Sequence, residues 1–230
     1  MQGVLYGVGV GPGDPKLLTL LAVETLQQVD KVIVPDMGGE KTALAIVAEY
    51  IKDKPKLLCH LPMTRDEAAL AAAHEAAAAL ICKALAEGQN LAFITLGDPT
   101  VYSTYIYLHR LVLAKGFEAK IINGVPSFCA VAAKLNISLC DKAEALHIIP
   151  ASYSNTQEML ALDGNKVLMK SGKQLGEVIA MLQEQDLIAH AKMVERCGME
   201  GETIYQDLSQ VTDSSYFSVV VVKEKDDGCQ

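Results

Sequence analysis

The N-terminal segment, residues 7–14 (GVGVGPGD), combines glycine, proline and an acid in a pattern that could bind a ligand. Its alternating glycines lack β-carbons, so a ligand or another stretch of backbone can approach closely. The spacing does not match the dinucleotide fingerprint G-x-G-x-x-G, because the third glycine position holds Pro12 or Asp14, depending on the register. The phosphate-binding pattern G-x-x-x-x-G-K-[ST] is also missing from the sequence. The segment is therefore either a ligand contact or a tight strand-to-helix turn.

Three further segments stand where a predicted strand meets a predicted helix: residues 95–104 (TLGDPTVYST), 124–128 (GVPSF) and 169–173 (MKSGK). The pair Asp98 and Pro99 predicts a turn directly after a buried strand. Open α/β sheets bind ligands at the carboxyl ends of their strands, and helix N-termini offer free N–H groups there. Ordinary helix capping by Ser103, Thr104 or Ser127 would explain the same hydroxyl groups. Both interpretations stay open at this point.

Residue types that perform acid–base, nucleophilic or metal chemistry are present but are not grouped. The five histidines are scattered, and His74 with Glu75 lacks the second histidine of H-E-x-x-H. The nucleophile motif G-x-S-x-G is missing, and none of the six cysteines forms a C-x-x-C pair. We therefore predict no catalytic triad and no protein-bound metal, and we interpret the cysteines as reduced, mostly buried thiols.

The charge balance excludes some classes of partner. The chain has 230 residues, and its 28 acidic side chains exceed its 20 lysines and arginines, which gives a formal net charge of −8. A general nucleic-acid-binding protein needs the opposite balance, so we expect no nucleic acid. The N-terminus lacks the basic and apolar regions of a signal peptide. No apolar run approaches the roughly 20 residues that span a bilayer, so we expect no membrane partner and a cytoplasmic location.

The order of predicted elements favours an α/β fold with two domains. Strand and helix signals alternate over the first two thirds of the chain, which predicts a largely parallel sheet. Asp14 and Pro15 predict the start of the first helix, and the Ala-rich residues 65–87 predict the longest one. Later strands lie close together in sequence and predict a mixed sheet. We place the domains at residues 1–118 and 119–230.

Three of the motifs recur in one order in a known family. The sequences V-G-V-G-P-G-D-P, L-G-D-P-x-x-Y-S-T and G-V-P-S-F together resemble the tetrapyrrole (corrin/porphyrin) methyltransferases, which are class III S-adenosylmethionine enzymes. The resemblance covers about residues 3–222. Ser127 and Phe128 before an Ala-rich helix, and L-P-M-T at 61–64, resemble the branch that methylates carbon C20 of precorrin-2 or cobalt-factor II in cobalamin biosynthesis. One departure is Asn123 before Gly124, where many relatives have proline.

The resemblance implies two α/β domains with S-adenosyl-L-methionine in the cleft between them, and a homodimer. It implies that the cofactor is contacted by Pro12, Leu96, Gly97, Asp98, Val101, Ser103, Thr104, Ser127, Phe128 and Met169. It implies that the macrocycle lies near Gly9, Gly11, Gly13, Asp14, Tyr102, Lys170 and Lys173. A loop of the second half, Arg196, Cys197 and Gly198, is a further candidate for the cofactor pocket.

The implied reaction agrees with the missing triad. A sulfonium methyl group is already activated and a meso carbon of a reduced tetrapyrrole is electron-rich, so the transfer depends mainly on placement. Placement of two bound reactants can supply roughly 7–11 kcal/mol of the barrier. The macrocycle is a polycarboxylate, so we expect a local basic rim from Arg65, Lys170 and Lys173, although such lysines are often merely solvated. Water, a carboxylate or a tyrosine could accept the meso proton.

Other hypotheses fit parts of the sequence. A methyltransferase acting on another carbon of a corrin precursor shares most of the motifs. A ribosomal-RNA methylase of this fold is disfavoured by the acidic charge balance, and a diphthine synthase by the C20-type motifs. From different classes, a nicotinamide-dependent reductase would need the dinucleotide fingerprint that fails here, and a non-catalytic tetrapyrrole-binding protein would show no affinity for S-adenosylmethionine.

Overall fold

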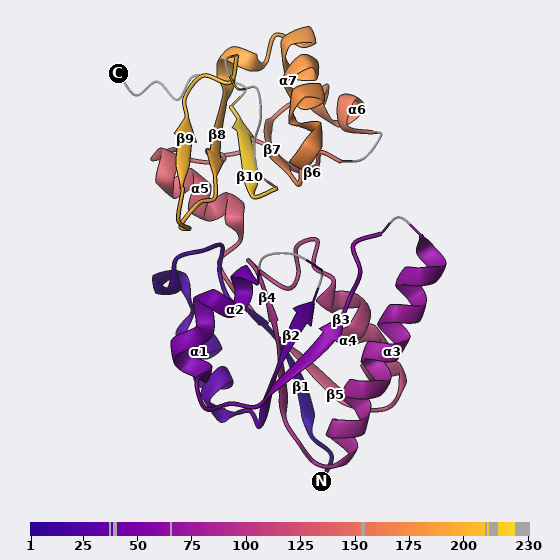
Figure 1. The fold of residues 1–230 in the computed structure, drawn as a ribbon. Helices are drawn as coiled ribbons and strands as arrows, with labels where there is room; N and C mark the ends of the chain where they lie inside the picture. Colours follow the sequence, from indigo (N-terminus) through magenta and orange to yellow (C-terminus); the bar gives the residue numbers. More distant parts are fainter. Residues whose placement is uncertain are drawn as a thin grey trace. The chain divides into compact units, whose positions relative to one another are not determined.

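The computed structural model describes residues 1–36, 38, 41–64, 66–152, 155–209, 211 and 216–223. The chain divides into two compact units, Met1–Pro126 and Ser127–Gln230, each built on one five-stranded sheet (Figure 1). The expected division between residues 118 and 119 falls inside β5 (Glu118–Ile122). This strand pairs with β1 (Val4–Gly9) of the first sheet, so the first unit continues to Pro126.

The first sheet is parallel, with the strand order β3-β2-β4-β1-β5. Its remaining strands are β2 (Lys31–Asp36), β3 (Lys56–His60) and β4 (Leu91–Thr95). β4 lies at the centre and is buried at every position, as its unbroken apolar sequence predicts. The largely parallel sheet that the alternation of strand and helix signals predicted is confirmed. The carboxyl ends of its strands share one edge of the sheet.

Helices cover both faces of this sheet (Figure 1). On one face, α1 (Leu20–Gln28) and α2 (Thr42–Val47), which continues as η2 (Ala48–Ile51), pack against one apolar cluster that includes Val8 and Ile94. On the other face, α3 (Glu67–Ala86) and α4 (Tyr105–Ala114) pack against a second cluster that includes Leu5 and Phe93. The connections that leave the neighbouring strands β1 and β4 therefore run to opposite faces, and such a switch point is where open α/β sheets bind ligands.

The first helix begins later than the sequence predicted. The Asp14 side chain accepts a hydrogen bond from Lys16 N (2.9 Å), and this caps only the short 3₁₀ turn η1 (Pro15–Leu17). Leu18 is extended, which ends the turn. α1 begins at Leu20, with the Thr19 hydroxyl accepting from Ala22 N (3.1 Å). The prediction was wrong because Thr19 provides a second capping residue, and that cap begins the α-helix.

α3 is the one helix, among the residues that the structure describes, that is long and apolar enough to cross a membrane by length and composition. The prediction that no segment meets this criterion was wrong, because the many alanines count as apolar. A third of the apolar window is buried, and Ile81 and Leu85 are fully buried in the cluster around Leu5. Length and composition are weak grounds for a membrane span, because core helices meet the same criterion.

The second sheet is mixed, as predicted, with the order β6-β7-β10-β8-β9. Its strands are β6 (Leu146–Pro150), β7 (Asn165–Met169), β8 (Ala191–Glu195), β9 (Thr203–Tyr205) and β10 (Ser218–Val222). β6 and β7 are parallel, and β10 runs antiparallel to both β7 and β8. The carboxyl ends of β6, β7 and β8 therefore share one edge.

The helices of the second unit are α5 (Ser127–Leu135), α6 (Thr156–Leu160) and α7 (Leu175–Glu184), with the 3₁₀ turns η3 (Gly172–Gln174) and η4 (Ile188–His190). Buried side chains of α6 and α7 share an apolar cluster with β7, β8 and β10. α5 contacts β8 and β10. The sheet thus has helical cover that fixes its strands independently of the first unit.

Three glycines of the first unit are required by close packing. A β-carbon on Gly7 would collide with the ring of the fully buried Tyr105. A β-carbon on Gly9 would lie 2.7 Å from the carbonyl oxygen of Gly97, and one on Gly124 would collide with the same oxygen. The alternation of Gly7 and Gly9 is therefore explained by contacts inside the protein. The contact of Gly9 with a macrocycle remains a prediction.

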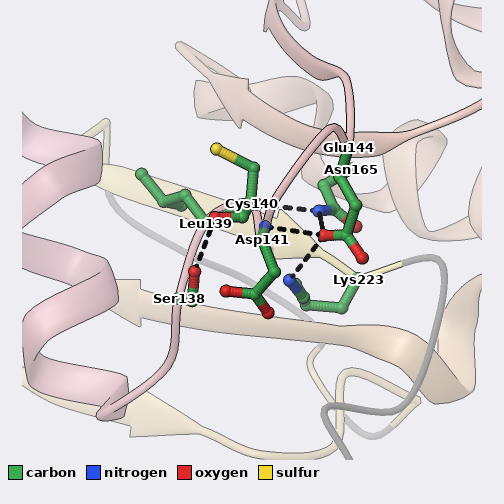
Figure 2. Close-up of polar contacts among 7 residues, drawn as sticks. All are labelled: Ser138, Leu139, Cys140, Asp141, Glu144, Asn165 and Lys223. Atoms are coloured by element: carbon green, nitrogen blue, oxygen red, sulfur yellow. Dashed lines mark hydrogen bonds and ion pairs between the residues drawn. The ribbon is translucent and has the colours of Figure 1, made fainter.

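At its amino-terminal edge the second sheet is held by Glu144 (Figure 2). One carboxylate oxygen accepts hydrogen bonds from Asp141 N (2.9 Å) and Asn165 Nδ2 (2.8 Å), and Lys223 Nζ lies 3.5 Å from it. These hydrogen bonds, with that of Asp141 the largest contribution, hold the pKa of Glu144 below its ordinary value. The Ser138 hydroxyl donates to the carbonyl of Cys140 (2.8 Å) in the same loop. The network ties the connection between α5 and β6 to the sheet.

We predict that Glu144→Gln lowers the melting temperature at pH 7, because the amide loses the charge and faces donors with its own N–H groups. A carboxylate whose folded pKa is depressed stabilises the protein above its unfolded pKa of about 4.3, and this contribution is lost as the pH falls through the folded pKa. The difference from wild type should therefore shrink below about pH 4. Thermal melts followed by circular dichroism test this, with Glu200→Gln, an exposed side chain of the same unit, as the control. Equal melting of Glu144→Gln and wild type at pH 7 would contradict the role of the network.

We also predict that Gly124→Ala destabilises the first unit by about 1–3 kcal/mol, because the new methyl group overlaps main-chain atoms that cannot rotate away. The matched control is Gly176→Ala, where no heavy atom lies within 4 Å of the new β-carbon and α7 favours alanine. Urea unfolding curves should show a loss for the first variant and no loss for the second. Equal stability of the two variants would show that the glycine packing has no energetic consequence.

Candidate functional site

The loops that follow β1 and β4 are joined through their main chains at the switch point. Gly97 N donates to Gly11 O (2.8 Å), and Gly11 N donates to Gly97 O (3.2 Å). Both glycines have positive φ angles, +75° for Gly11 and +73° for Gly97, a conformation that costs glycine little. Val10 N adds a hydrogen bond to Thr95 O (2.9 Å). The two loops therefore occupy fixed positions relative to each other.

Asp98 connects the loop after β4 to the end of β5. Its Oδ1 atom accepts hydrogen bonds from Thr100 N (2.7 Å) and from the Thr100 hydroxyl, which closes a turn over Pro99. Its Oδ2 atom accepts from Gly124 N (2.9 Å) and Asn123 Nδ2 (3.3 Å). The side chain is 5% exposed. Asp98 thus fixes the β4 loop against residues that lie 25 and 26 positions further along the chain.

The environment of Asp98 favours its ionised form. Burial by itself raises the pKa of the carboxyl group, but the hydrogen bonds from Thr100, Gly124 and Asn123 outweigh it. The pKa is therefore lowered from its ordinary value. A carboxylate that accepts several N–H and O–H bonds is expected to behave in this way. Asp98 carries a negative charge at neutral pH.

The rest of this loop leads into α4. The Ser103 hydroxyl accepts from Tyr105 N (3.1 Å) and lies 3.1 Å from the Thr95 hydroxyl, so Ser103 caps the helix as one interpretation of the sequence predicted. Thr104 is the N-terminal flanking residue but makes no side-chain capping bond. Tyr102 has a φ angle of +46°, which costs a residue with a β-carbon roughly 1–2 kcal/mol. The fold maintains this strained loop conformation.

The structure gathers the predicted residues of the first unit at the carboxyl edge of its sheet. Gly9 ends β1, and the turn after it places the buried residues Gly11, Pro12 and Gly13 and the half-buried Asp14. The β4 loop adds half-buried or buried side chains and main chain from Leu96, Gly97, Asp98, Val101, Ser103 and Thr104, and the exposed Tyr102. The sequence analysis missed Thr100, Asn123 and Gly124 as partners of Asp98. The unusual Asn123 was noted as a departure, but no local signal links it to Asp98.

The predicted residues of the second unit lie at two places. Ser127 and Phe128 open α5, with Ser127 half-buried and Phe128 buried. Met169 ends β7 at the carboxyl edge of the second sheet, and Lys170 follows it with a φ angle of +58°. Burial lowers the pKa of the Lys170 ammonium group. Arg65 lies outside the described residues, and so does the side chain of Lys173, so Lys170 is the member of the expected basic rim that the structure places.

Arg196 follows β8 at the same edge as Lys170, and it also has a positive φ angle, +51°. Its Nε atom donates to Glu200 O (2.7 Å), and its guanidinium group lies 5.8 Å from the centre of the Phe217 ring. Ser171 follows Lys170 in the chain and Ser218 follows Phe217. The hydroxyl groups of these two buried serines lie 3.1 Å apart. The edge therefore places two cationic residues, each in a conformation that is unusual for a residue with a side chain.

Within the described part of the chain, no three or more histidine, cysteine, aspartate or glutamate side chains gather in a way that could hold a metal ion. The cysteines in that part are all free, with Cys59, Cys82 and Cys197 buried and Cys129 and Cys140 exposed. Burial raises the pKa of the Cys59 and Cys197 thiols to about 11, so these thiols are protonated at neutral pH. The residues that the first unit brings together at its carboxyl edge provide main-chain groups, hydroxyl groups and the carboxyl groups of Asp14 and Asp98, a set suited to binding and positioning.

Comparisons with known proteins identify the family. The family model described as tetrapyrrole (corrin/porphyrin) methylases matches residues 4–212. The chain is 35% identical to a protein of Methanocaldococcus jannaschii named a probable cobalt-precorrin-2 C(20)-methyltransferase, over 95% of each chain. It is 32% identical to the cobalt-precorrin-2 C(20)-methyltransferase of Salmonella typhimurium, over 98% of each chain.

The fold has close counterparts among solved structures. The uroporphyrin-III C-methyl transferase of Thermus thermophilus, solved in complex with S-adenyl homocysteine, superposes with a TM-score of 0.72 at 18% identity. The match covers 96% of this chain and 98% of that one. The expected fold class, an α/β methyltransferase fold with two α/β domains, is confirmed. The chain belongs to the tetrapyrrole (corrin/porphyrin) methylases and is a C-methyltransferase.

Proposed function

We propose that this enzyme transfers a methyl group from S-adenosyl-L-methionine to the meso carbon C20 of a precorrin-2-type macrocycle, with or without bound cobalt. The observation that carries the proposal is the similarity to two proteins named as C20-methyltransferases, which extends over 95% and 98% of this chain. The motifs that suggested the C20 branch, L-P-M-T at 61–64 and Ser127 with Phe128, are a second indication from the sequence. The proposed cofactor is a co-substrate, and the proposal includes no protein-bound metal.

The carboxyl edge of the first unit fits a nucleoside cofactor with a cationic centre. The edge lies at the switch point of an open α/β sheet, where ligands bind in this class of fold. Its half-buried groups are the hydroxyls of Ser103 and Thr104 and the apolar side chains of Leu96 and Val101. Its hydrogen-bond network holds the Asp98 carboxylate, which is negative. The half-buried Asp14 adds a second acidic side chain at the same edge. These groups match a ligand that has apolar and hydroxyl-bearing portions and a positively charged centre.

The chemistry supplied by the cofactor, when it is bound, is a sulfonium methyl group that is ready for displacement. The chain's own contribution is placement. The Gly11–Gly97 hydrogen bonds and the Asp98 network hold three loops in one arrangement before any ligand arrives. Preorganised placement of two reactants can account for roughly 7–11 kcal/mol of a barrier. The proposal therefore needs no covalent intermediate on the protein.

Further parts of the proposal concern the macrocycle and the assembly. We propose that Lys170 faces a carboxylate of the macrocycle, because it is a cationic residue at the carboxyl edge of the second sheet and the macrocycle is a polycarboxylate. Gly9, Gly11, Gly13, Asp14, Tyr102 and Lys173 complete the proposed macrocycle contacts. We also propose a homodimer in the cytoplasm, with no nucleic-acid or membrane partner, on the basis of the family resemblance and the sequence alone.

The test is an anaerobic incubation of the purified enzyme with S-adenosylmethionine carrying a carbon-13 methyl group, with precorrin-2 and cobalt-precorrin-2 offered in parallel. Mass spectrometry counts the methyl groups added, and carbon-13 NMR locates them. We expect a single methyl group at C20 of one substrate. Omission of the labelled cofactor is the control. A methyl group at another carbon, or no transfer to either macrocycle, would contradict the proposed substrate and position.

A further inference from the structure

Asp98 is a buried negative charge that is surrounded by neutral donors. It is 5% exposed, and its four hydrogen bonds come from two backbone N–H groups, a hydroxyl group and an amide. No cationic side chain in the described ranges forms an ion pair with it. Burying an ionised carboxylate costs free energy unless something compensates the charge. The hydrogen bonds compensate the loss of water, but they leave the net charge in place.

The same geometry limits what Asp98 can do for a ligand. A carboxylate has about four acceptor positions on its two oxygens. Oδ1 is occupied by the two bonds from Thr100, and Oδ2 by those from Gly124 and Asn123. A direct hydrogen bond to a ligand would have to displace one of these donors and loosen the loop. The carboxylate can therefore act on a ligand through its electric field, at a distance, without contact.

We propose that Asp98 is a positioning residue that, through its charge, favours the cationic sulfonium form of the cofactor over the neutral thioether product. This inference rests on the proposed function, because it takes the cofactor to be S-adenosylmethionine bound at the carboxyl edge of the first unit. It also revises the sequence-based expectation for Asp98, which placed the residue in contact with the cofactor. The interaction is long-range, and it is stronger near a protein interior than in water.

The positive charge on the sulfur is lost during the reaction. The carbon–sulfur bond breaks with its electron pair staying on sulfur, a carbon–carbon bond forms with a pair from the macrocycle, and the meso carbon then releases its proton to water. The sulfur is thereby neutral, so the attraction to Asp98 ends when the methyl group leaves. The attraction weakens as the sulfur loses its charge, so the field stabilises the bound reactant more than the transition state. It therefore favours cofactor binding and product release and does not accelerate the transfer.

The test compares the dissociation constants of S-adenosylmethionine and S-adenosylhomocysteine, measured by calorimetry on the whole chain. Asp98→Asn removes the charge and keeps the size of the side chain. Asn123→Lys places a cation beside Oδ2 from an exposed position, so it neutralises the charge and leaves the carboxylate in place. Asn123→Ala removes the same hydrogen bond and adds no charge, and is the matched control.

We expect Asp98→Asn and Asn123→Lys to weaken the sulfonium ligand relative to the thioether by about fivefold, and Asn123→Ala to leave the ratio unchanged. A purely structural role would weaken both ligands together, so an unchanged ratio in both charge variants overturns the inference. An equal shift in Asn123→Ala would overturn it as well. If Asp98→Asn does not fold, the comparison of Asn123→Lys with Asn123→Ala decides. If the wild-type protein bound neither ligand, the result would instead contradict the proposed cofactor, S-adenosylmethionine.

Discussion

Two hydrogen bonds between Gly11 and Gly97 determine how the carboxyl edge of the first sheet is arranged. They join the loops that follow β1 and β4, the two strands whose connections diverge to opposite faces of the sheet. Gly97 also supplies the carbonyl oxygen against which Gly9 and Gly124 pack. A β-carbon on Gly9 or Gly124 would overlap these main-chain atoms, so a side chain at either position would move the loops apart. Asp98 then attaches the end of β5 to the same arrangement.

The elements of the fold follow closely from local sequence. The buried strand before Asp98, the Ala-rich α3 and the mixed second sheet all agree with the sequence patterns. The errors occur where two signals compete. Asp14 and Pro15 are residue types typical of a helix N-terminus, but they begin only a 3₁₀ turn. Thr19 caps the α-helix that follows. The predicted domain boundary fell inside β5 because the pattern of strand signals changes near residue 120, whereas pairing with β1 assigns β5 to the first unit.

The sequence predicted where the candidate residues stand in the fold but not which groups they contact. The order of the motifs, and the position of each after a strand, made Leu96, Gly97, Asp98 and Ser103 candidates. The role of Asp98 depends on Asn123 and Gly124, and no local pattern connects residues separated by 25 positions or more. The reason for Gly7 likewise lies in tertiary packing, because a β-carbon there would collide with a tyrosine of α4. A local sequence pattern predicts which residue types stand at the end of a strand. The hydrogen bonds between residues far apart in sequence depend on the tertiary structure.

We propose that the enzyme binds its cofactor at a preformed carboxyl edge of the first sheet and that the cofactor forms no hydrogen bond with the Asp98 carboxylate. The most direct measurement is a crystal structure of the protein with S-adenosylhomocysteine. We expect the ligand to lie against the loops after β1 and β4, with the four hydrogen bonds of Asp98 intact and no ligand atom bonded to its oxygens. A ligand bound away from this edge, or hydrogen-bonded to the carboxylate in place of Thr100 or Gly124, would contradict this proposal.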